Sequence, residues 1–290
     1  MIAKLAADVA VPAQCELAEG PVWDAARGLL RWVDILRGRV HALDPASGAH
    51  TWFEAGDPVG AVGLTRDGGL VIALADRFAL ADHDGQHLRR LGGFTVDRAV
   101  FRFNDGKPDP WGGFQAGTMA WTAGPQCSLY RLSPDGEVTE RLGGIGLSNG
   151  LDWSDDRTQF YFADTHSGRV DVFETDPDTG ALRGRRRSVT VSGGSPDGLT
   201  LDAEGCLWLA AWGSGELRRY APEGRLDTVV SLPVRQVTSA AFGGTDLSTL
   251  YITTARENFT PADLREQPHA GDIFACTPGV TGRPPFRFGR

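Results

Sequence analysis

An internal repeat runs through almost the whole of this 290-residue chain. Its six copies open at Glu19, Val62, Asn104, Asn149, Asp197 and Ser239. The openings are separated by 43, 42, 45, 48 and 42 residues, and each is followed by an apolar segment and a polar break. The breaks contain Asp-Gly, Pro-Asp-Gly and similar groups, which supply the left-handed backbone positions that tight hairpins need. The repeat therefore predicts six units, each made of three or four short strands.

Repeats of this length built from short strands are typical of the blades of a β-propeller. We predict an all-β fold, a single six-bladed propeller domain that spans residues 1–290. A β-sandwich or a chain of hairpins is the alternative, but neither keeps a fixed period through six copies. A propeller must close its ring, and we expect the segment AQCELAEG, residues 13–20, to complete the last blade. Residues 260–271 have room for one helical turn.

The charge and the hydropathy pattern restrict the partners of the protein. With 29 basic and 37 acidic residues the formal net charge is −8. This balance argues against a nucleic acid or an anionic membrane as partner, because both attract basic surfaces. No apolar run approaches ~18 residues, so we expect no transmembrane helix. The first residues lack the apolar core of a signal peptide, so we expect a cytoplasmic protein, as a monomer or a weak homo-oligomer.

The four cysteines, Cys15, Cys127, Cys206 and Cys276, lie far apart and form no Cys-x-x-Cys motif. Their spacing gives no sign of a thiolate zinc site. Counting alone leaves two disulfides open, but reduced thiols are expected in a protein without an export signal.

Polar residues recur at the opening of the repeat. In a propeller the first strand of each blade lines the central channel, so equivalent positions face the same height of that channel. Five of the six openings are polar, the exception being Val62. Four of them carry a carboxylate or carboxamide: Glu19, Asn104, Asn149 and Asp197. Such side chains around one point make a site for a hard divalent cation, because such ions prefer oxygen ligands. No His or Cys occupies these positions, so a nitrogen- and sulfur-liganded zinc site is not indicated, although zinc also accepts oxygen ligands. The alternative is that Asn-Gly and Asp-Gly are simply turn residues.

Five motifs carry a resemblance to a known family: LAEGPVWD, RFNDGKPDPWGGFQAGTM, LSNGLDWS, SPDGLTLDAEGCLWLA and TSAAFGGTDLSTLYITTARE. Together they resemble the SMP-30/gluconolactonase/regucalcin family over nearly the whole chain. The resemblance implies a six-bladed propeller with one divalent ion in its channel, with Ca²⁺, Zn²⁺, Mg²⁺ and Mn²⁺ all left open. It implies hydrolysis of sugar lactones, such as gluconolactone, xylonolactone or arabinolactone, to aldonic acids. Carried over residue by residue, it implies the metal ligands Glu19, Asn149 and Asp197 and the substrate contacts Arg102 and Asn104.

The chain departs from the family after the AGTM motif. Many relatives carry an acidic pair there, where this chain has Trp121 and Thr122, and residues 119–127 form a short segment. We interpret the change as a different sugar size or orientation, with Trp121 shaping the substrate pocket. The alternative is that Trp121 is an ordinary core residue.

These residues suggest a mechanism for opening a lactone. A bound divalent ion polarises the carbonyl and lowers the pKa of a water. Asp197 can ligate the ion with one oxygen and accept a proton with the other as a general base. Arg102 and Asn104 would hold the ring hydroxyls, Arg102 through its fixed set of donors. Two alternatives stay open: a metal-dependent ester or phosphoester hydrolase on the same scaffold, and a non-catalytic calcium-binding regulator. The presence of Arg102 favours an enzyme, because a calcium buffer needs no group that orients a substrate.

Overall fold

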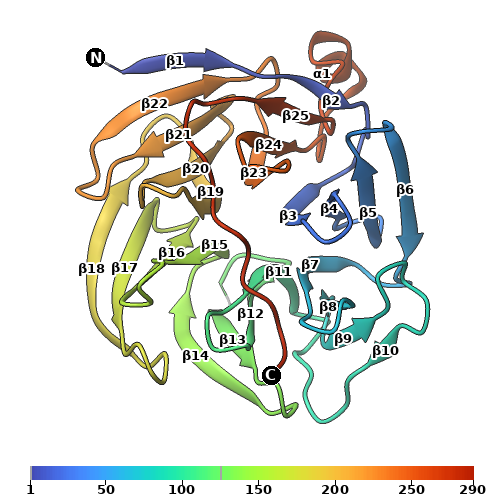
Figure 1. Cartoon of the computed structure of the whole chain (residues 1–290), viewed down its shortest axis with the longest axis vertical. Helices are drawn as coiled ribbons and strands as arrows, with labels where there is room; N and C mark the ends of the chain where they lie inside the picture. The colour runs from blue at the N-terminus through green and yellow to red at the C-terminus, as the bar shows by residue number, and fades with distance from the viewer. Residues whose placement is uncertain (1, 125) are drawn as a thin grey trace.

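The computed structural model describes residues 2–124 and 126–290, and it is nearly all β. Six antiparallel sheets of four strands each are arranged in a ring, and one of them gains a fifth, parallel strand (Figure 1). The six-bladed propeller predicted from the repeat is thereby confirmed. Apart from the N-terminal strands, the strands of each blade follow one another in chain order from the centre of the ring outward. Consecutive strands pair because the hairpin connections between them are only a few residues long.

The first three blades follow one another without interruption. The first contains β3 (Ala18–Asp24), β4 (Leu29–Asp34), β5 (Arg39–Asp44) and β6 (Ala49–Glu54). The second contains β7 (Val59–Leu64), β8 (Leu70–Leu74), β9 (Phe78–Ala81) and β10 (Arg89–Arg90). The third contains β11 (Phe101–Pro108), β12 (Phe114–Ala120), β13 (Cys127–Leu132) and β14 (Val138–Ile145).

The other three blades complete the ring and take up the N-terminal strands. The fourth contains β15 (Ser148–Trp153), β16 (Gln159–Asp164), β17 (Arg169–Thr175) and β18 (Leu182–Thr190). The fifth contains β19 (Ser195–Leu201), β20 (Leu207–Trp212), β21 (Glu216–Tyr220), β22 (Leu226–Ser231) and β1 (Ala3–Ala6). The sixth contains β23 (Val237–Gly243), β24 (Thr249–Thr254), β25 (Ile273–Cys276) and β2 (Asp8–Val11).

The strand that closes the ring is β2, so the expectation of residues 13–20 in that position is wrong. Strand β2 pairs with β25 as the outermost strand of the sixth blade. Pro12 follows directly, and Gln14 has a positive φ of 48°, so the backbone leaves the sheet before residues 13–20 can join it. Ala18 to Asp24 already form β3, the inner strand of the first blade.

A single short helix, α1 (Pro261–Glu266), is found among the described residues, where the sequence has room for one helical turn. Thr260 and Asp263 form a capping box, in which each side chain bonds the backbone N–H of the other. Such a cap satisfies two N–H groups that the first turn of a helix leaves free. Helix α1 lies in the connection between β24 and β25.

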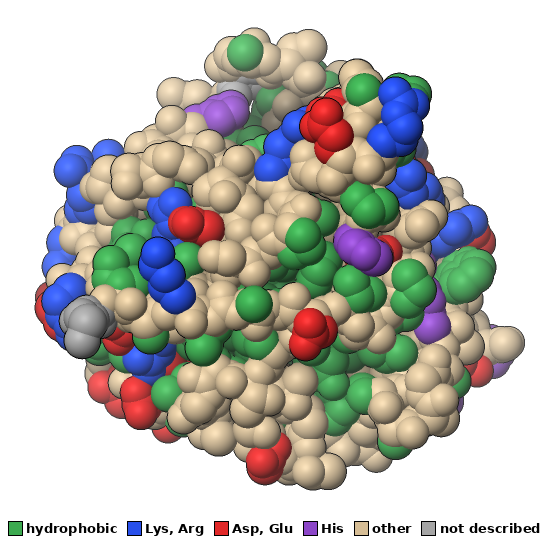
Figure 2. All heavy atoms as spheres, turned by 90° about the horizontal axis from the view of Figure 1, so that it is seen from above, with side chains coloured by type: hydrophobic (Ala, Val, Ile, Leu, Met, Phe, Trp, Pro, Cys, Tyr) green, Lys and Arg blue, Asp and Glu red, His purple; other side chains and the backbone are tan. Residues whose placement is uncertain are grey.

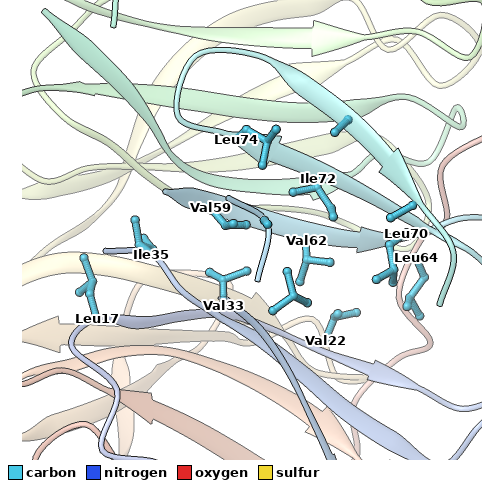
Figure 3. Close-up of a cluster of buried hydrophobic side chains, with 14 of the residues drawn as sticks. Leu17, Val22, Val33, Ile35, Val59, Val62, Leu64, Leu70, Ile72 and Leu74 are labelled. Carbon is cyan, nitrogen blue, oxygen red and sulfur yellow. The ribbon is translucent and has the colours of Figure 1, made fainter. Parts of the chain in front are cut away.

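The core lies between adjacent blades. Figure 3 shows this packing for the first two blades, where Val22 and Val33 face Val59, Val62 and Ile72 across the interface. Val33, Val59 and Ile72 are fully buried. Each blade therefore buries both of its faces against its neighbours. This explains why second strands such as β8 (LVIAL) and β20 (LWLAAW) read as nearly continuous apolar runs rather than as alternating ones.

The C-terminal segment, residues 277–290, crosses one end of the ring (Figure 1). Its backbone bonds Ala203, Leu247, Leu64 and Gly112, which belong to loops and strand ends of four different blades. Arg283 in this segment donates to the Trp153 carbonyl oxygen at 2.8 Å. These contacts hold the segment against the ends of the inner strands, so this end of the channel is covered.

The outer surface shows no separation of charge by sign on the face drawn in Figure 2, where basic and acidic side chains are interspersed. Within residues 2–124 and 126–290, no helix has the length and apolar character needed to cross a membrane.

Candidate functional site

Every inner strand carries a β-bulge near its start. The register shifts lie at Glu19/Val22, Val59/Ala61, Phe103/Gly106, Ser148/Leu151, Pro196/Leu199 and Val237/Ser239. A bulge inserts an extra residue into one strand and re-aims its side chains. Six bulges at one level of a ring therefore turn a set of side chains toward a common centre.

Glycines at the bulges let neighbouring inner strands approach closely. A Cβ on Gly150 would lie 2.4 Å from the backbone nitrogen of Leu199. A Cβ on Gly198 would lie 2.2 Å from the Ser239 hydroxyl, and one on Gly60 would lie 2.6 Å from the Phe103 carbonyl. No side chain fits at these positions, because real Cβ atoms stay farther from neighbouring atoms. The pairs Asn149-Gly150 and Asp197-Gly198 are thus inner-strand features rather than hairpin turns.

The strand pairing agrees with the register read from the repeat at five of its six openings. Counted from the pairs beside each inner hairpin, equivalent positions are held by Glu19, Asn104, Asn149, Asp197 and Ser239. In the second blade the equivalent residue is Gly60, so the expected opening Val62 lies two residues too late. Asp105, which the sequence reasoning missed, takes the position that Gly150 and Gly198 hold in the fourth and fifth blades.

Three buried carboxyl groups meet at this level of the channel. Glu19, Asp105 and Asp197 are all buried, and each accepts the backbone N–H of the glycine that follows it. Burial, reinforced by the charges of Asp197 and Asp105, raises the pKa of Glu19 well above its usual range. Burial and the Asp105 charge likewise raise the pKa of Asp197, although bonds from Asn149, Gly198 and Glu19 oppose the shift. Burial raises the pKa of Asp105 to about 6, against the opposing effects of Lys107 and the Gly106 N–H.

This arrangement fits a hard divalent cation. The Asn149 side-chain oxygen is buried and has no hydrogen-bond partner among the described residues, while its Nδ2 donates to Thr165 Oγ1 at 3.1 Å. A buried polar atom without a partner is costly unless a ligand satisfies it. Three crowded carboxyl groups are also costly when ionised, and a cation between them would remove both penalties. Glu19, Asn149 and Asp197 can hold such an ion, with Asp105 close by.

Arg102 and Asn104 lie against each other beside this cluster. Arg102 Nη1 donates to Asn104 Oδ1 at 2.8 Å, and Asn104 Nδ2 donates to the Ser148 carbonyl oxygen at 3.0 Å. The Arg102 guanidinium is buried, and its Nε has no partner among the described residues. Burial lowers the pKa of Arg102 to about 10, against the opposing charges of Glu257 and Glu19, so it keeps its charge at neutral pH. Residue-based reasoning gave no signal for Arg102, which came only from the resemblance.

Trp121 lies at the end of the channel opposite the C-terminal segment. It follows β12, whose last residue, Ala120, pairs with the first residue of β11. Its side chain is 46% exposed, so the alternative of a core tryptophan is wrong. Its ring lies 5.6 Å from the Arg102 guanidinium, within the range of a cation–π contact, and Nε1 donates to the Arg98 carbonyl oxygen at 3.1 Å.

A groove of about 340 Å³ is lined by Trp121 together with Thr122, Gln126 and His166. We call this end of the channel the mouth. Pro125, inside the segment 119–127, lies outside the described residues.

The fold and these channel residues define a class, the regucalcin-like six-bladed propellers. The chain belongs to the SMP-30/Gluconolactonase/LRE-like family, whose model matches residues 17–256. It is 41% identical to regucalcin of Gallus gallus, over 94% of each chain. It is 37% identical to 6-deoxy-6-sulfogluconolactonase of Pseudomonas putida, over 92% of each chain.

The structure of a regucalcin from Agrobacterium tumefaciens, described as a calcium-binding protein, superposes with a TM-score of 0.92 at 30% identity. The superposition covers 99% of both chains. The family resemblance seen in the motifs is confirmed, and it supports a lactonase-type hydrolase.

Proposed function

We propose that this protein is a divalent-metal-dependent hydrolase that opens sugar lactones to aldonic acids. The observation that carries the proposal is the cluster of Glu19, Asn149 and Asp197 next to a buried, charged Arg102. The oxygen atoms suit a hard cation, and the guanidinium suits a hydroxylated substrate. The sulfogluconolactonase relative supports a lactone of a sugar acid as the substrate class, such as gluconolactone, xylonolactone or arabinolactone.

Glu19, Asn149 and Asp197 would hold the cation. When bound, the cation supplies an electrophile for the lactone carbonyl and lowers the pKa of a water. Asp197 would accept a proton from the attacking water through the carboxylate oxygen that does not ligate the cation. The protonated Asp197 can then return that proton to the ring oxygen as the ester bond breaks.

Arg102, Asn104 and Trp121 position the substrate. The Arg102 guanidinium offers donors to ring hydroxyls, and its bond to Asn104 fixes the direction of both groups. Trp121, in the place of the family's acidic pair, presents an exposed ring at the mouth that can stack on the C–H face of a sugar. Loss of two carboxylates at that position favours a lactone that is less polar on the side facing the mouth.

The test is hydrolysis of an aldonolactone panel at slightly acidic pH, with and without a chelator, after subtraction of spontaneous hydrolysis. Asp197→Asn should lower kcat by about 10²–10⁴-fold while the protein stays folded and still binds the cation, more weakly. Asp246→Asn, an exposed turn residue, is the control and should keep full activity.

Three results would contradict the proposal. Calcium binding without turnover of any lactone would point to a non-catalytic calcium-binding protein. Faster turnover of simple esters or phosphoesters than of lactones would point to the other hydrolase class. Retention by Asp197→Asn of more than about a tenth of the wild-type kcat with saturating cation would remove Asp197 as the base.

A further inference from the structure

A second cluster of ligand-type side chains differs chemically from the channel residues, because it contains a thiol and an imidazole. Cys15, Asp34 and His41 each offer one ligand atom, and these atoms lie within 4.8 Å of one another. Cys15 Sγ and His41 Nε2 are 3.9 Å apart. All three side chains are buried, and Cys15 is free, as are the other three cysteines. The proposed hydrolysis uses none of these groups.

The backbone holds the three groups in place. Cys15 lies in the connection between β2 and β3, directly after Gln14 with its positive φ of 48°. The Cys15 N–H donates to the Gly271 carbonyl oxygen at 2.8 Å. The Asp34 carboxylate, at the end of β4, accepts the N–H groups of Glu16 and Leu17 at 2.9 and 3.1 Å. The connection is thus wrapped around the carboxylate, which keeps the thiol beside it.

The neighbours of the cluster match the surroundings of a metal ligand. His41 Nδ1 lies 2.9 Å from His50 Nε2, so the other nitrogen, Nε2, faces the thiol. A ligating histidine normally has such a hydrogen bond on its second nitrogen, which fixes the ring and its tautomer. Trp32 Nε1 donates to Cys15 Sγ at 3.5 Å, a contact that stabilises a sulfur carrying negative charge. Burial and the nearby His50 also lower the pKa of His41 to about 3, so its imidazole is neutral, as a ligand must be.

We propose that Cys15 Sγ, His41 Nε2 and an Asp34 oxygen bind one ion of the zinc type. Zinc bonds of about 2.0–2.3 Å place the ligand atoms of a tetrahedral site roughly 3.3–3.8 Å apart, so atoms that now lie within 4.8 Å need to approach by at most about 1.5 Å. A thiolate and a carboxylate balance the two positive charges of the ion. Three protein ligands with a water in the fourth position are an established zinc arrangement.

Binding at this site releases a proton. Burial and the Asp34 charge raise the pKa of Cys15 to about 12, so without metal the thiol keeps its proton. The S–H bond breaks, the proton leaves to solvent, and the sulfur electron pair forms the bond to the metal. No oxidant or reductant is needed.

A metal at this site would stabilise the closure of the ring. Cys15 follows β2 of the sixth blade, whereas Asp34 and His41 belong to β4 and β5 of the first. A metal bridging these residues ties the segment that leaves the closing strand to the body of the first blade. This role is independent of the proposed lactonase activity.

The experiment separates this site from the channel by its sulfur. Reduced, chelator-stripped full-length protein is titrated with Cd²⁺ in excess Ca²⁺, and the thiolate-to-cadmium charge-transfer absorption is recorded. Oxygen ligands give no such band, so cadmium in the channel is silent. We expect the band to saturate at about one equivalent in the wild type.

Cys127→Ser is the matched control, because Cys127 is equally buried, its sulfur donates to the Gly146 carbonyl oxygen at 3.6 Å, and among the described residues it belongs to no cluster of ligand-type side chains. This variant should keep the band, and Cys15→Ser should lose it. If Cys15→Ser does not fold, His41→Gln takes its place and should weaken cadmium binding about tenfold or more. Zn²⁺ should also raise the melting temperature of the wild type and not that of His41→Gln. Absence of the band in the wild type, its persistence in Cys15→Ser, or an unchanged cadmium affinity in His41→Gln would overturn the proposal.

Discussion

Replacing Asp105 by Asn should stabilise the metal-free protein at neutral pH. Asp105 is one of three buried carboxyl groups in the channel, and burial is the main reason that its pKa rises to about 6. Asn keeps an oxygen that can accept the Gly106 N–H, as Asp105 does at 2.6 Å. The substitution therefore removes a charge and retains the local hydrogen bond.

The size of the effect follows from the pKa. A pKa raised from 3.8 to about 6 corresponds to about 3 kcal/mol of free energy of unfolding. Between these two values the folded state binds more protons at Asp105 than the unfolded state does, so stability falls as pH rises. The contribution of the protonated group is complete below about pH 4 and is lost above about pH 6. The variant should lack this loss, and it should also lower the pKa of Glu19 and Asp197, because the Asp105 charge raises both.

Urea unfolding in the presence of a chelator measures this effect, with wild type and Asp105→Asn compared at about pH 4 and pH 7. We expect similar stability at the lower pH and an advantage of about 1–3 kcal/mol for the variant at the higher pH. Saturating Ca²⁺ should shrink the advantage, because a cation neutralises the same cluster. A variant that is less stable than wild type at neutral pH in chelator, or an unchanged pH slope, would refute the electrostatic account of the site.

Three further predictions concern the mouth, the C-terminal segment and the domain. Trp121→Ala should raise KM for the preferred lactone several-fold and leave cation affinity unchanged. Trp52→Ala is the matched control, because Trp52 is similarly exposed and also lies over an arginine, on the first blade. Unchanged kinetics of Trp121→Ala would show that Trp121 does not belong to the substrate pocket. Arg283→Met should lower the free energy of unfolding by about 1–3 kcal/mol in urea, because it leaves the buried Asp152 carboxylate with one cationic partner fewer. Residues 1–290 should unfold in one cooperative transition, and fluorescence and circular dichroism curves that do not coincide would indicate a second unit.

The architecture could be predicted from the sequence because each blade of a propeller corresponds to one sequence repeat. One repeat makes one blade, and a blade cannot bury its faces without neighbours, so six copies indicate a closed ring of six. The helical turn at residues 261–266 was also predictable, because Thr260, Pro261 and Asp263 form a local cap signal.

The closure of the ring was harder to predict. The apolar residues of 13–20 look like a strand, but Pro12 and the left-handed Gln14 interrupt the chain before them. The chain then enters the first blade instead of the last. Strand β1 pairs in parallel with β22 and adds a fifth strand to the fifth blade. This strand lies outside the sequence repeat, so the repeat could not predict it. Edge strands of this kind depend on tertiary position, and their local sequence carries little signal.

The Cys15, Asp34 and His41 cluster was invisible for a different reason. Metal motifs are recognised in sequence when ligands share a turn or a helix face. Here the loop before the first blade folds back onto β4 and β5, so three residues without a motif spacing meet only because the ring closes. The expectation of no thiolate zinc site rested on the spacing of the cysteines alone, which says nothing about the contact of Cys15 with Asp34 and His41.

The channel site shows how packing and chemistry are divided between adjacent residues. In the fourth and fifth blades the second bulge residue has to be a glycine, because the next inner strand leaves no room for a Cβ on Gly150 or Gly198. The residue before it is free to vary, and in chain order the equivalent residues of the six blades are Glu19, Gly60, Asn104, Asn149, Asp197 and Ser239. The ring therefore fixes where these residues lie, while their identity fixes the chemistry. In the third blade Asp105 takes the place of the glycine. The third carboxyl group of the channel therefore comes from a position that holds glycine in the fourth and fifth blades, and aligning the repeat on its polar openings alone cannot reveal it.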